Sequence, residues 1–311
     1  MPKEQKSEQL FHEYFHNWVK LYKVDAIRNV TLKKYLTTNK WLVQYVPKLK
    51  LCDLTRQTYQ QILNDYAAEH EKQTTMNFHH QLKSAILDAV DDGLILNNPV
   101  RKVVIKGKVS KNERAKFLNQ TELKSLLNQL QLGDELNWDW FILIAAKTGL
   151  RFSEILALIP EDFDFENHLI TVNKSWDYKD KEGGFQPTKN TSSNRKIQID
   201  IELSKQLKKL LATCKPEKAI FIKDDSRVFN STINDYLKRL CEQAEVPIIT
   251  MHSLRHTHAS LLIFAGVSIA SVSRRLGHAT ITTTQETYLH IIKELEIIDG
   301  DKITKLLMNL I

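Results

Sequence analysis

Four stretches of helical hydrophobic spacing occupy the first hundred residues. Apolar side chains recur every three to four positions, as on the buried face of an amphipathic helix. Thr55 precedes the third stretch in an N-cap position, and Gly93 follows the fourth. This region is therefore predicted to be a bundle of four helices. The inward positions, helix by helix, are Leu10, Phe11, Tyr14, Phe15, Trp18 and Val19; Leu32, Tyr35, Leu36, Leu42, Val43 and Val46; Tyr59, Ile62, Leu63 and Tyr66; and Leu82, Ala85, Ile86, Ala89 and Val90.

The hydrophobic pattern changes after Pro99. The stretch 101–116 is basic and lacks helical spacing, which indicates a linker. Asn119 and Glu122 have the spacing of a capping box and open the next helix. We place a first domain at 1–105, a linker at 106–117 and a second domain at 118–311.

The second domain is predicted to be mainly helical around a small sheet. A mostly apolar helix is predicted over 138–147, and the stretches 169–172, 184–187 and 195–199 have the length and composition of short strands. We expect these strands to form a three-stranded antiparallel sheet, with Lys189 on its second turn. The fold class is then mostly α with a small β-sheet (α+β).

Composition narrows the possible partners. Residues 1–110 hold 17 lysines and arginines against 11 aspartates and glutamates, so most of the net charge of +7 lies there. Such an excess favours a polyanion, because neutralised phosphates release counterions. The chain has no apolar run that could span a bilayer and no N-terminal secretion signal, which predicts a cytoplasmic protein. Its 3 cysteines are far apart and are expected to be reduced.

Six polar residues of the second half form a candidate site for a phosphodiester. Two guanidinium groups can hold the non-bridging oxygens of one phosphate and stabilise a five-coordinate transition state. A tyrosine hydroxyl is a potential nucleophile, but with a reference pKa of about 10 it needs a base or cationic neighbours. Histidine and lysine side chains can transfer the protons. The six residues are Arg151, Lys189, His252, Arg255, His278 and Tyr288.

Local spacing places some of these residues on helices. His252 and Arg255 lie three residues apart and share one helix face. Gly266 is expected to end that helix, and Ser268 begins a short one that Gly277 closes. His278 would then follow a helix end.

Each residue also has a structural interpretation. Most arginines are solvated, and a lone histidine or tyrosine more often packs than reacts, so His256 and His258 are interpreted as structural. His252 and His256 have the spacing of zinc ligands on a helix. However, Ser253 stands where a zinc protease has glutamate, and Arg255 would repel a dication, so no metal is predicted.

Three segments carry a resemblance to a known family. TGLRFSE at 148–154, HSLRHTHAS at 252–260 and LGHATITTTQETYLH at 276–290 resemble the arginine box, the His-x-x-Arg box and the tyrosine box of the tyrosine recombinases, the phage integrase family. In this resemblance Glu154 is the acidic support of Arg151. PTKNTSSNRKI at 187–197 is similar to the family's lysine loop, with Lys189 as the catalytic lysine and Lys196 as the alternative.

The resemblance implies a site-specific DNA recombinase of a phage or mobile element. Tyr288 would form a 3′-phosphotyrosyl link while Arg151 and Arg255 hold the phosphate and His278 adds a hydrogen bond. His252 would exchange the tyrosine proton, and Lys189 would protonate the 5′-hydroxyl. Neither ATP nor a metal or other cofactor is expected. The helical bundle would be a core-binding domain, with candidate phosphate contacts at Lys33, Lys34, Lys40, Lys48, Lys50 and Lys83.

Strand exchange implies a homotetramer on double-stranded DNA with attachment-type sites, with possible accessory directionality or bending proteins. An apolar stripe near the C-terminus would dock either on a neighbouring protomer or on its own domain; it comprises Ile297, Ile298, Ile303, Leu306, Leu307 and Leu310. The chain starts at the apparent core-binding bundle, so the sequence leaves binding to arm-type DNA sites open. Either the sequence is a shortened form of a longer integrase, or the protein is a simpler recombinase that works without accessory sites. A monomeric type IB topoisomerase, a non-catalytic DNA-binding regulator and a metal-dependent hydrolase are the alternatives.

Overall fold

The computed structural model describes residues 8–109, 117–180, 182–188, 190–223, 227–289 and 308. The chain divides into two compact units, Met1–Glu113 and Arg114–Ile311, and each has its own hydrophobic core. Within the described ranges, no helix combines the length and the hydrophobicity needed to cross a membrane.

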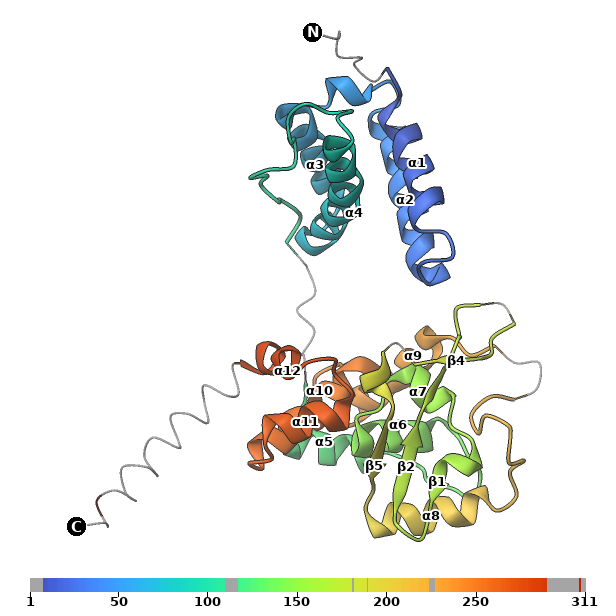
Figure 1. Cartoon of the computed structure of the whole chain (residues 1–311). Helices are drawn as coiled ribbons and strands as arrows, with labels where there is room; N and C mark the ends of the chain where they lie inside the picture. The colour runs from blue at the N-terminus through green and yellow to red at the C-terminus, as the bar shows by residue number, and fades with distance from the viewer. Residues whose placement is uncertain are drawn as a thin grey trace. The chain divides into compact units, whose positions relative to one another are not determined.

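The first unit is a bundle of four helices, as the sequence predicts (Figure 1). These are α1 (Phe11–Tyr22), α2 (Asn29–Tyr45), α3 (Arg56–Glu69) and α4 (Lys72–Asp91), with the short 3₁₀ helix η1 (Leu51–Asp53) before α3. The Thr55 side chain accepts a hydrogen bond from the backbone N–H of Thr58 and so caps α3. The stripe expected on α1 is buried from Phe11 to Val19.

The prediction of the buried face of α2 is partly wrong. The helix buries Leu42 and Thr38, whereas Leu36 and Val43 are 37% and 44% exposed. Leu36 and Val43 are seven residues apart and share a face that points away from the core. Thr38 is tolerated in the core because its hydroxyl donates a hydrogen bond of 2.6 Å to the side-chain oxygen of Gln81 on α4.

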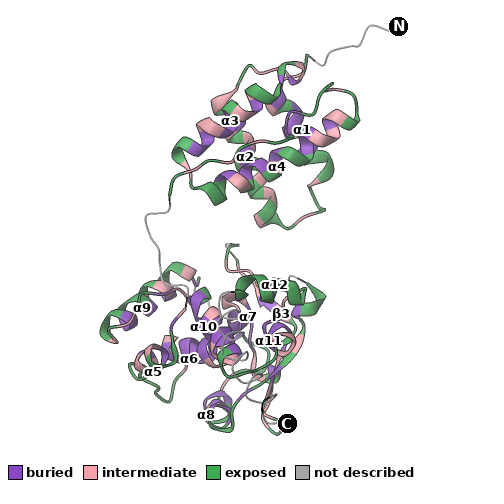
Figure 2. Ribbon diagram, turned by 90° about the vertical axis from the view of Figure 1, so that its left-hand side faces the viewer, coloured by how far each residue is buried: buried purple, intermediate pink, exposed green. Residues whose placement is uncertain are grey.

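The second unit is built around two buried helices. Its helices are α5 (Gln120–Leu127), α6 (Trp138–Thr148), α7 (Phe152–Leu156), α8 (Ile201–Leu211), α9 (Asn230–Gln243), α10 (Met251–Phe264), α11 (Ile269–Leu276) and α12 (Ile281–Thr287), with the 3₁₀ turns η2 (Pro160–Asp162) and η3 (Thr191–Ser193). The sequence of α6 is apolar on nearly every side, and such a helix is stable only when it is covered all round. It packs against α10, and both helices are largely buried in Figure 2.

In the described part of the second unit, five short strands form two sheets, which corrects the expected pairing. Strands β1 (Phe163–Asp164), β2 (Leu169–Val172) and β5 (Arg195–Gln198) make the three-stranded antiparallel sheet in the order β1-β2-β5. The stretch 184–187, expected as the second of the three strands, contains β4 (Phe185–Pro187), which pairs instead with β3 (Lys174–Trp176) in a separate hairpin. Proline at the end of β4 lacks a backbone donor, and such a strand suits an edge better than the centre of a sheet.

Local capping signals define the helix ends of this unit. Asn119 and Glu122 form the predicted capping box of α5. Gly149 and Gly277 end α6 and α11 with φ of 68°, the left-handed conformation that glycine adopts without strain.

We expect Gly149→Ala to lower the free energy of unfolding by at least about 1 kcal/mol, the cost of a side chain in the left-handed region. A Cβ at this position would also lie 2.7 Å from the Cδ2 atom of His258. Urea unfolding measures the change. Gly133→Ala is the matched control, because a Cβ there meets no atom within 4 Å. Equal stability of the two variants would contradict the predicted strain.

Candidate active site

Several of the predicted site residues of the second unit lie at the ends of helices. Arg151 is the N-cap of α7 and follows the left-handed turn at Gly149. His278 follows the turn at Gly277, and Tyr288 is the C-cap of α12. Arg255 lies within α10, where it is 3% exposed.

The guanidinium groups of Arg151 and Arg255 meet at the end of α11. Arg255 donates hydrogen bonds of 2.7 Å to the carbonyl of Gly149 and 2.5 Å to the carbonyl of Leu276. Arg151 donates one of 3.0 Å to the next carbonyl, that of Gly277. Consecutive carbonyls belong to Cα atoms only about 3.8 Å apart, so the two arginines converge as a phosphate clamp requires.

The charge on Arg255 is stabilised by helix ends. Gly149 and Leu276 lie at the C-termini of α6 and α11, where carbonyl groups carry partial negative charge. Burial and the neighbouring charge of Arg151 lower the pKa of Arg255 to about 9. Arg255 therefore stays cationic at neutral pH, close to a second cation.

A buried carboxylate, Glu154, holds Arg151 in place. Its side chain is 3% exposed, and its Oε1 atom accepts a hydrogen bond of 2.6 Å from Arg151. Its Oε2 atom accepts from the backbone N–H of Arg151 at 2.9 Å and from the guanidinium of Arg195, also at 2.9 Å. Burial opposes the charge of Glu154, but Arg195 and then Arg151 outweigh that effect, so its pKa is lowered. The predicted support of Arg151 by Glu154 is thus accompanied by a second arginine.

Arg195 was missed in the sequence analysis. Besides Glu154, it donates hydrogen bonds to the carbonyls of Arg275 at 2.7 Å and Ser193 at 2.8 Å, so it links β5 to α7 and α11. Strand alternation could have found it, because Arg195 shares the inward-facing side of β5 with Ile197.

The histidines of the site differ in their surroundings. Desolvation, together with the charges of Arg255 and Arg151, lowers the pKa of His252, although part of its side chain remains exposed. His278 is more strongly affected: burial, Arg255 and Arg151 lower its pKa to about 4. Its Nδ1 atom lies 2.7 Å from the hydroxyl oxygen of Thr284. At neutral pH His278 is therefore a neutral hydrogen-bonding group.

His258 has a structural role, as interpreted from the sequence. Its Nδ1 atom lies 2.9 Å from the carbonyl of Ala146, and its Nε2 atom lies 2.8 Å from the Nε atom of Arg275. Because the arginine nitrogen can only donate, Nε2 accepts and Nδ1 carries the proton. Burial and the charge of Arg275 lower the pKa of His258 to about 4, consistent with a neutral ring.

Tyr288 is buried and contacts a histidine that the sequence analysis assigned to structure. The residue is 2% exposed and packs with Ala259, Val272 and Leu276. Its hydroxyl lies 3.0 Å from the Nδ1 atom of His256. The spacing of four residues between His252 and His256 was the signal that could have placed both rings at one site.

Other predicted features lie near the site or outside the described residues. Lys189 and the C-terminal apolar stripe lie outside them. The alternative lysine, Lys196, is on the exposed side of β5 and lines an open pocket of about 660 Å³ together with Arg274 and His278. Within the described part of the chain, no three His, Cys, Asp or Glu side chains gather so that they could hold a metal ion.

We expect Glu154→Gln to lower the free energy of unfolding by about 3 kcal/mol at neutral pH, because it leaves buried guanidinium charge uncompensated. The folded-state pKa of Glu154 is lowered, so its stabilisation is present above its unfolded pKa of about 4.3 and is lost as the pH falls below that value. The difference from the wild type in urea unfolding should therefore narrow at acidic pH. Glu166→Gln, at an exposed position, is the control. An unchanged midpoint for Glu154→Gln at pH 7 would refute the role of its charge.

Comparisons with known proteins identify the family. A family model described as the phage integrase family matches residues 116–294. The integrase of Staphylococcus phage L54a is 28% identical over 208 residues, a match that covers 59% of this chain and 59% of that protein. The chain thus matches about three fifths of the length of this curated relative.

Solved structures show the same fold. The Tn1549 transposon integrase in complex with a circular intermediate DNA has a TM-score of 0.76 at 20% identity, with 89% of this chain and 94% of that chain covered. A lambda integrase tetramer bound to a Holliday junction has a TM-score of 0.63 at 20% identity, with 88% and 79% covered. Since the family model spans more than half of the sequence and contains Arg151, Arg255 and Tyr288, this chain belongs to the phage integrase family.

Proposed function

We propose that this protein is a site-specific DNA recombinase that cleaves and rejoins DNA through a 3′-phosphotyrosyl intermediate. The observation that carries the proposal is the convergence of Arg151 and Arg255 on two consecutive carbonyls directly before His278. Two guanidinium groups that converge on neighbouring carbonyls can each bind a non-bridging oxygen of one phosphodiester. Family membership supports the same chemistry.

In the proposed reaction, Tyr288 attacks the scissile phosphate while Arg151 and Arg255 hold its non-bridging oxygens. Negative charge that develops on the five-coordinate phosphorus then faces cations that are already in place, which lowers the barrier. His278 is a neutral donor to a phosphate oxygen. His252 lies one turn before Arg255 on α10, on the same helix face.

The departing 5′-oxygen needs a proton, and we assign it to Lys189 with Lys196 as the alternative. The phosphotyrosyl link conserves the energy of the phosphodiester, so a second 5′-hydroxyl can reverse the step without ATP. In this scheme the protein side chains supply both the clamp and the proton transfers, and no metal ion is required.

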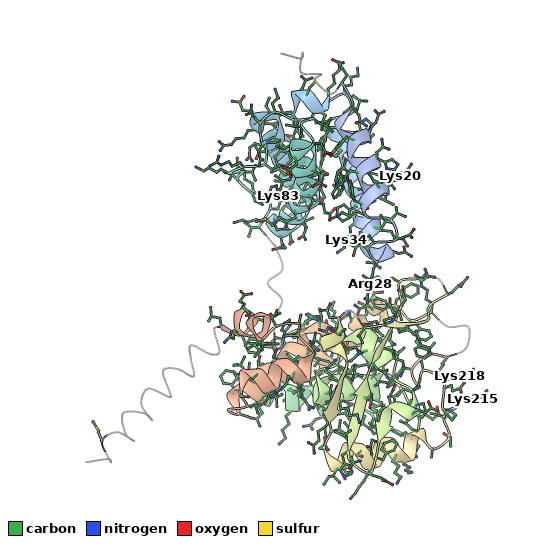
Figure 3. The ribbon with its side chains drawn as sticks, viewed as in Figure 1. Lys20, Arg28, Lys34, Lys83, Lys215 and Lys218 are labelled. Carbon is green, nitrogen blue, oxygen red and sulfur yellow. The ribbon has the colours of Figure 1, made fainter. Side chains whose placement is uncertain are left out.

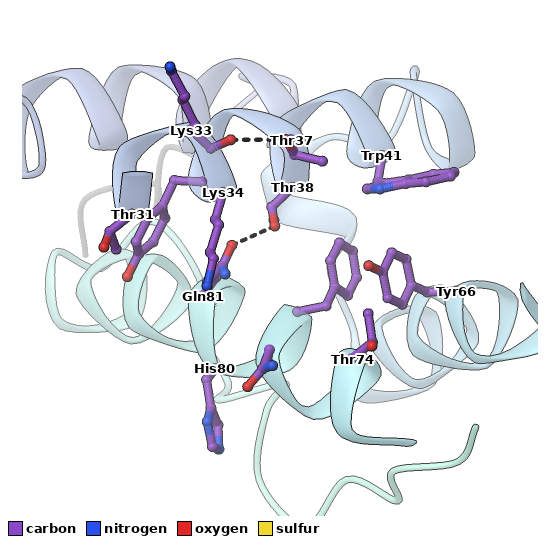
Figure 4. A pocket seen from close by; sticks show the side chains of 13 residues that line it. Thr31, Lys33, Lys34, Thr37, Thr38, Trp41, Tyr66, Thr74, His80 and Gln81 are labelled. Carbon is purple, nitrogen blue, oxygen red and sulfur yellow. Dashed lines mark hydrogen bonds between the residues drawn. The ribbon is translucent and has the colours of Figure 1, made fainter. Parts of the chain in front are cut away.

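We propose that the helical unit is a core-binding domain for duplex DNA. Exposed cations are distributed over its surface, including Lys20, Lys34 and Lys83 (Figure 3). An open pocket of about 550 Å³ between α2 and α4 is lined by Lys33, Lys34 and His80 (Figure 4). These side chains can approach phosphates. Lys50 is a weaker candidate, because it pairs with Glu8.

We also propose that four protomers assemble on two duplexes, because exchange of both strands requires four cleavage sites. The lambda integrase tetramer on a Holliday junction is a structural precedent for such an assembly. Attachment-type DNA sites and accessory directionality or bending proteins belong to the same proposal.

The assignment of Tyr288 as the nucleophile is tested by trapping a covalent complex between the protein and DNA. A nicked duplex that releases a short fragment on cleavage should leave wild-type protein covalently attached to DNA, and Tyr288→Phe should abolish this product while DNA binding persists. Denaturing electrophoresis detects the complex. Tyr236→Phe is the matched control, since it removes another tyrosine hydroxyl, one that lies 2.8 Å from Asp139. A covalent complex formed by Tyr288→Phe would refute the assignment.

The same experiment separates the alternative functions. A non-catalytic regulator binds DNA but leaves no covalent product in the wild type. A type IB topoisomerase forms the covalent complex and relaxes supercoils as a monomer, but gives no recombinants from two attachment-type sites. Full activity in a chelator excludes a metal-dependent hydrolase.

The general acid is tested with a leaving group that needs no proton. On ordinary DNA, Lys189→Ala should slow cleavage by about 100-fold or more, the usual contribution of a general acid. Replacing the 5′-bridging oxygen with sulfur should restore the rate, because a thiolate leaves without protonation. Lys196→Ala is the matched variant. If sulfur rescues Lys196→Ala instead, the acid is Lys196.

A further inference from the structure

The hydroxyl of Tyr288 is held by one imidazole ring. The residue closes the short helix α12, and its ring packs on Ala259 of α10 and Val272 of α11. At the far end of the ring, the hydroxyl oxygen lies 3.0 Å from the Nδ1 atom of His256. The apolar contacts thus fix the ring, and the histidine fixes the direction of the reactive atom.

This environment keeps the proton on the phenol. Burial raises the pKa of Tyr288 to about 12, although the charge of Arg255 partly opposes the increase. A phenol with such a pKa is protonated at neutral pH and is a poor nucleophile. Attack on phosphorus therefore requires a nearby atom that can accept the proton as the new bond forms.

His256 lies at the centre of the titratable groups of the site. On its own helix, the ring of His252 contacts it edge to face with 4.7 Å between centroids, and Arg255 is its chain neighbour. Tyr288 reaches it from the end of α12, and His278 lies within electrostatic range after α11. No element between His256 and Tyr288 has to move for a proton to pass, because Nδ1 and the hydroxyl are already at hydrogen-bond distance.

We propose that His256 is the general base that accepts the Tyr288 proton through Nδ1; this inference rests on the proposed recombinase function. As the Oη–P bond forms, the Oη–H proton moves to Nδ1 and His256 becomes an imidazolium. The P–O5′ bond breaks at the same phosphorus, and the 5′-oxygen takes its proton from the lysine acid. In rejoining, a 5′-hydroxyl attacks phosphorus and gives its proton to the lysine, which lost one in the first step. The P–Oη bond breaks, and the imidazolium returns its proton to the tyrosine oxygen.

The charge balance of the site fits this direction of transfer. Proton transfer to His256 creates a positive charge near Arg255 and Arg151, and repulsion between like charges makes this unfavourable in the free protein. Bound DNA brings the negative scissile phosphate to the same arginines, and a further negative charge develops in the transition state. The positive charge that forms on His256 is therefore best compensated when the substrate is in place.

This assignment gives His252 a different role from the one expected from the sequence. The direct hydrogen-bond partner of Tyr288 is His256, and His252 contacts the ring of His256. We infer that His252 is a positioning residue, which restricts the orientation of the imidazole that takes the proton.

Two substitutions separate proton acceptance from positioning. In His256→Asn, the amide occupies the place of Nδ1 and can still hydrogen-bond to Tyr288, but it cannot take up a proton. In His256→Ala, both properties are lost. We expect both variants to form the covalent complex with nicked DNA about 100-fold more slowly than the wild type at saturating DNA, within the range for a general base. Their DNA affinity should be unchanged.

His168→Asn is the matched control. The Nδ1 atom of His168 also lies 2.9 Å from a hydroxyl oxygen, that of Ser204, and its φ of 56° suits asparagine. This variant should cleave at the wild-type rate. If His256→Asn also does so, His256 only positions the tyrosine and the proposal is wrong.

A more acidic phenol gives a second readout that does not depend on the histidine variants folding equally well. Incorporation of 3,5-difluorotyrosine at position 288 lowers the need for a base, so it should recover most of the rate lost in His256→Asn and change the wild-type rate much less. An equal change of the cleavage rate in the wild type and in His256→Asn would overturn the proposal. Absence of any covalent complex in the wild type would instead reject the recombinase function itself.

Discussion

The second unit, which carries the candidate site, depends on the buried carboxylate of Glu154. A carboxylate with 3% exposure is unstable without partners, and here Arg151 and Arg195 supply them. The arginines stabilise the buried carboxylate, and the carboxylate in turn limits the positions that Arg151 can adopt. It also joins α7 to β5, so the two ion pairs of one carboxylate set both the fold around the site and the direction of the proposed phosphate clamp.

Arg255 is stabilised in another way, which leaves its charge available. Its guanidinium donates to carbonyls at the ends of α6 and α11. Such dipoles lower the cost of burying a cation but do not neutralise it. With Arg151, Arg195 and Arg255 around one carboxylate, the site has more positive than negative charge. In the proposed function, a phosphodiester supplies the missing anion, and the donors need not reorganise during the reaction.

Sequence analysis predicted the features of this protein that short segments encode. Caps such as Asn119 and stops such as Gly277 depend on neighbouring residues, and they were found at the expected places. The pairing of β4 with β3 was missed because strand partners are chosen by contacts distant in sequence. The contact between His256 and Tyr288 was missed for the same reason, since 32 residues separate them. Arg195 could have been predicted from strand alternation, because it lies on the same side of β5 as the buried Ile197.

The burial of Tyr288, the proposed nucleophile, limits how the site can be used. The ring of Tyr288 rests on α10 and α11, the helices that also carry or bind the guanidinium of Arg255. Withdrawing it would expose an aromatic side chain, at a cost of about 1.5–3 kcal/mol. The seven residues of α12 contribute little helical stability of their own, so this packing is what keeps Tyr288 in place. Any displacement of Tyr288 during DNA binding must therefore be offset by contacts with the DNA, which couples exposure of the nucleophile to occupancy of the phosphate clamp.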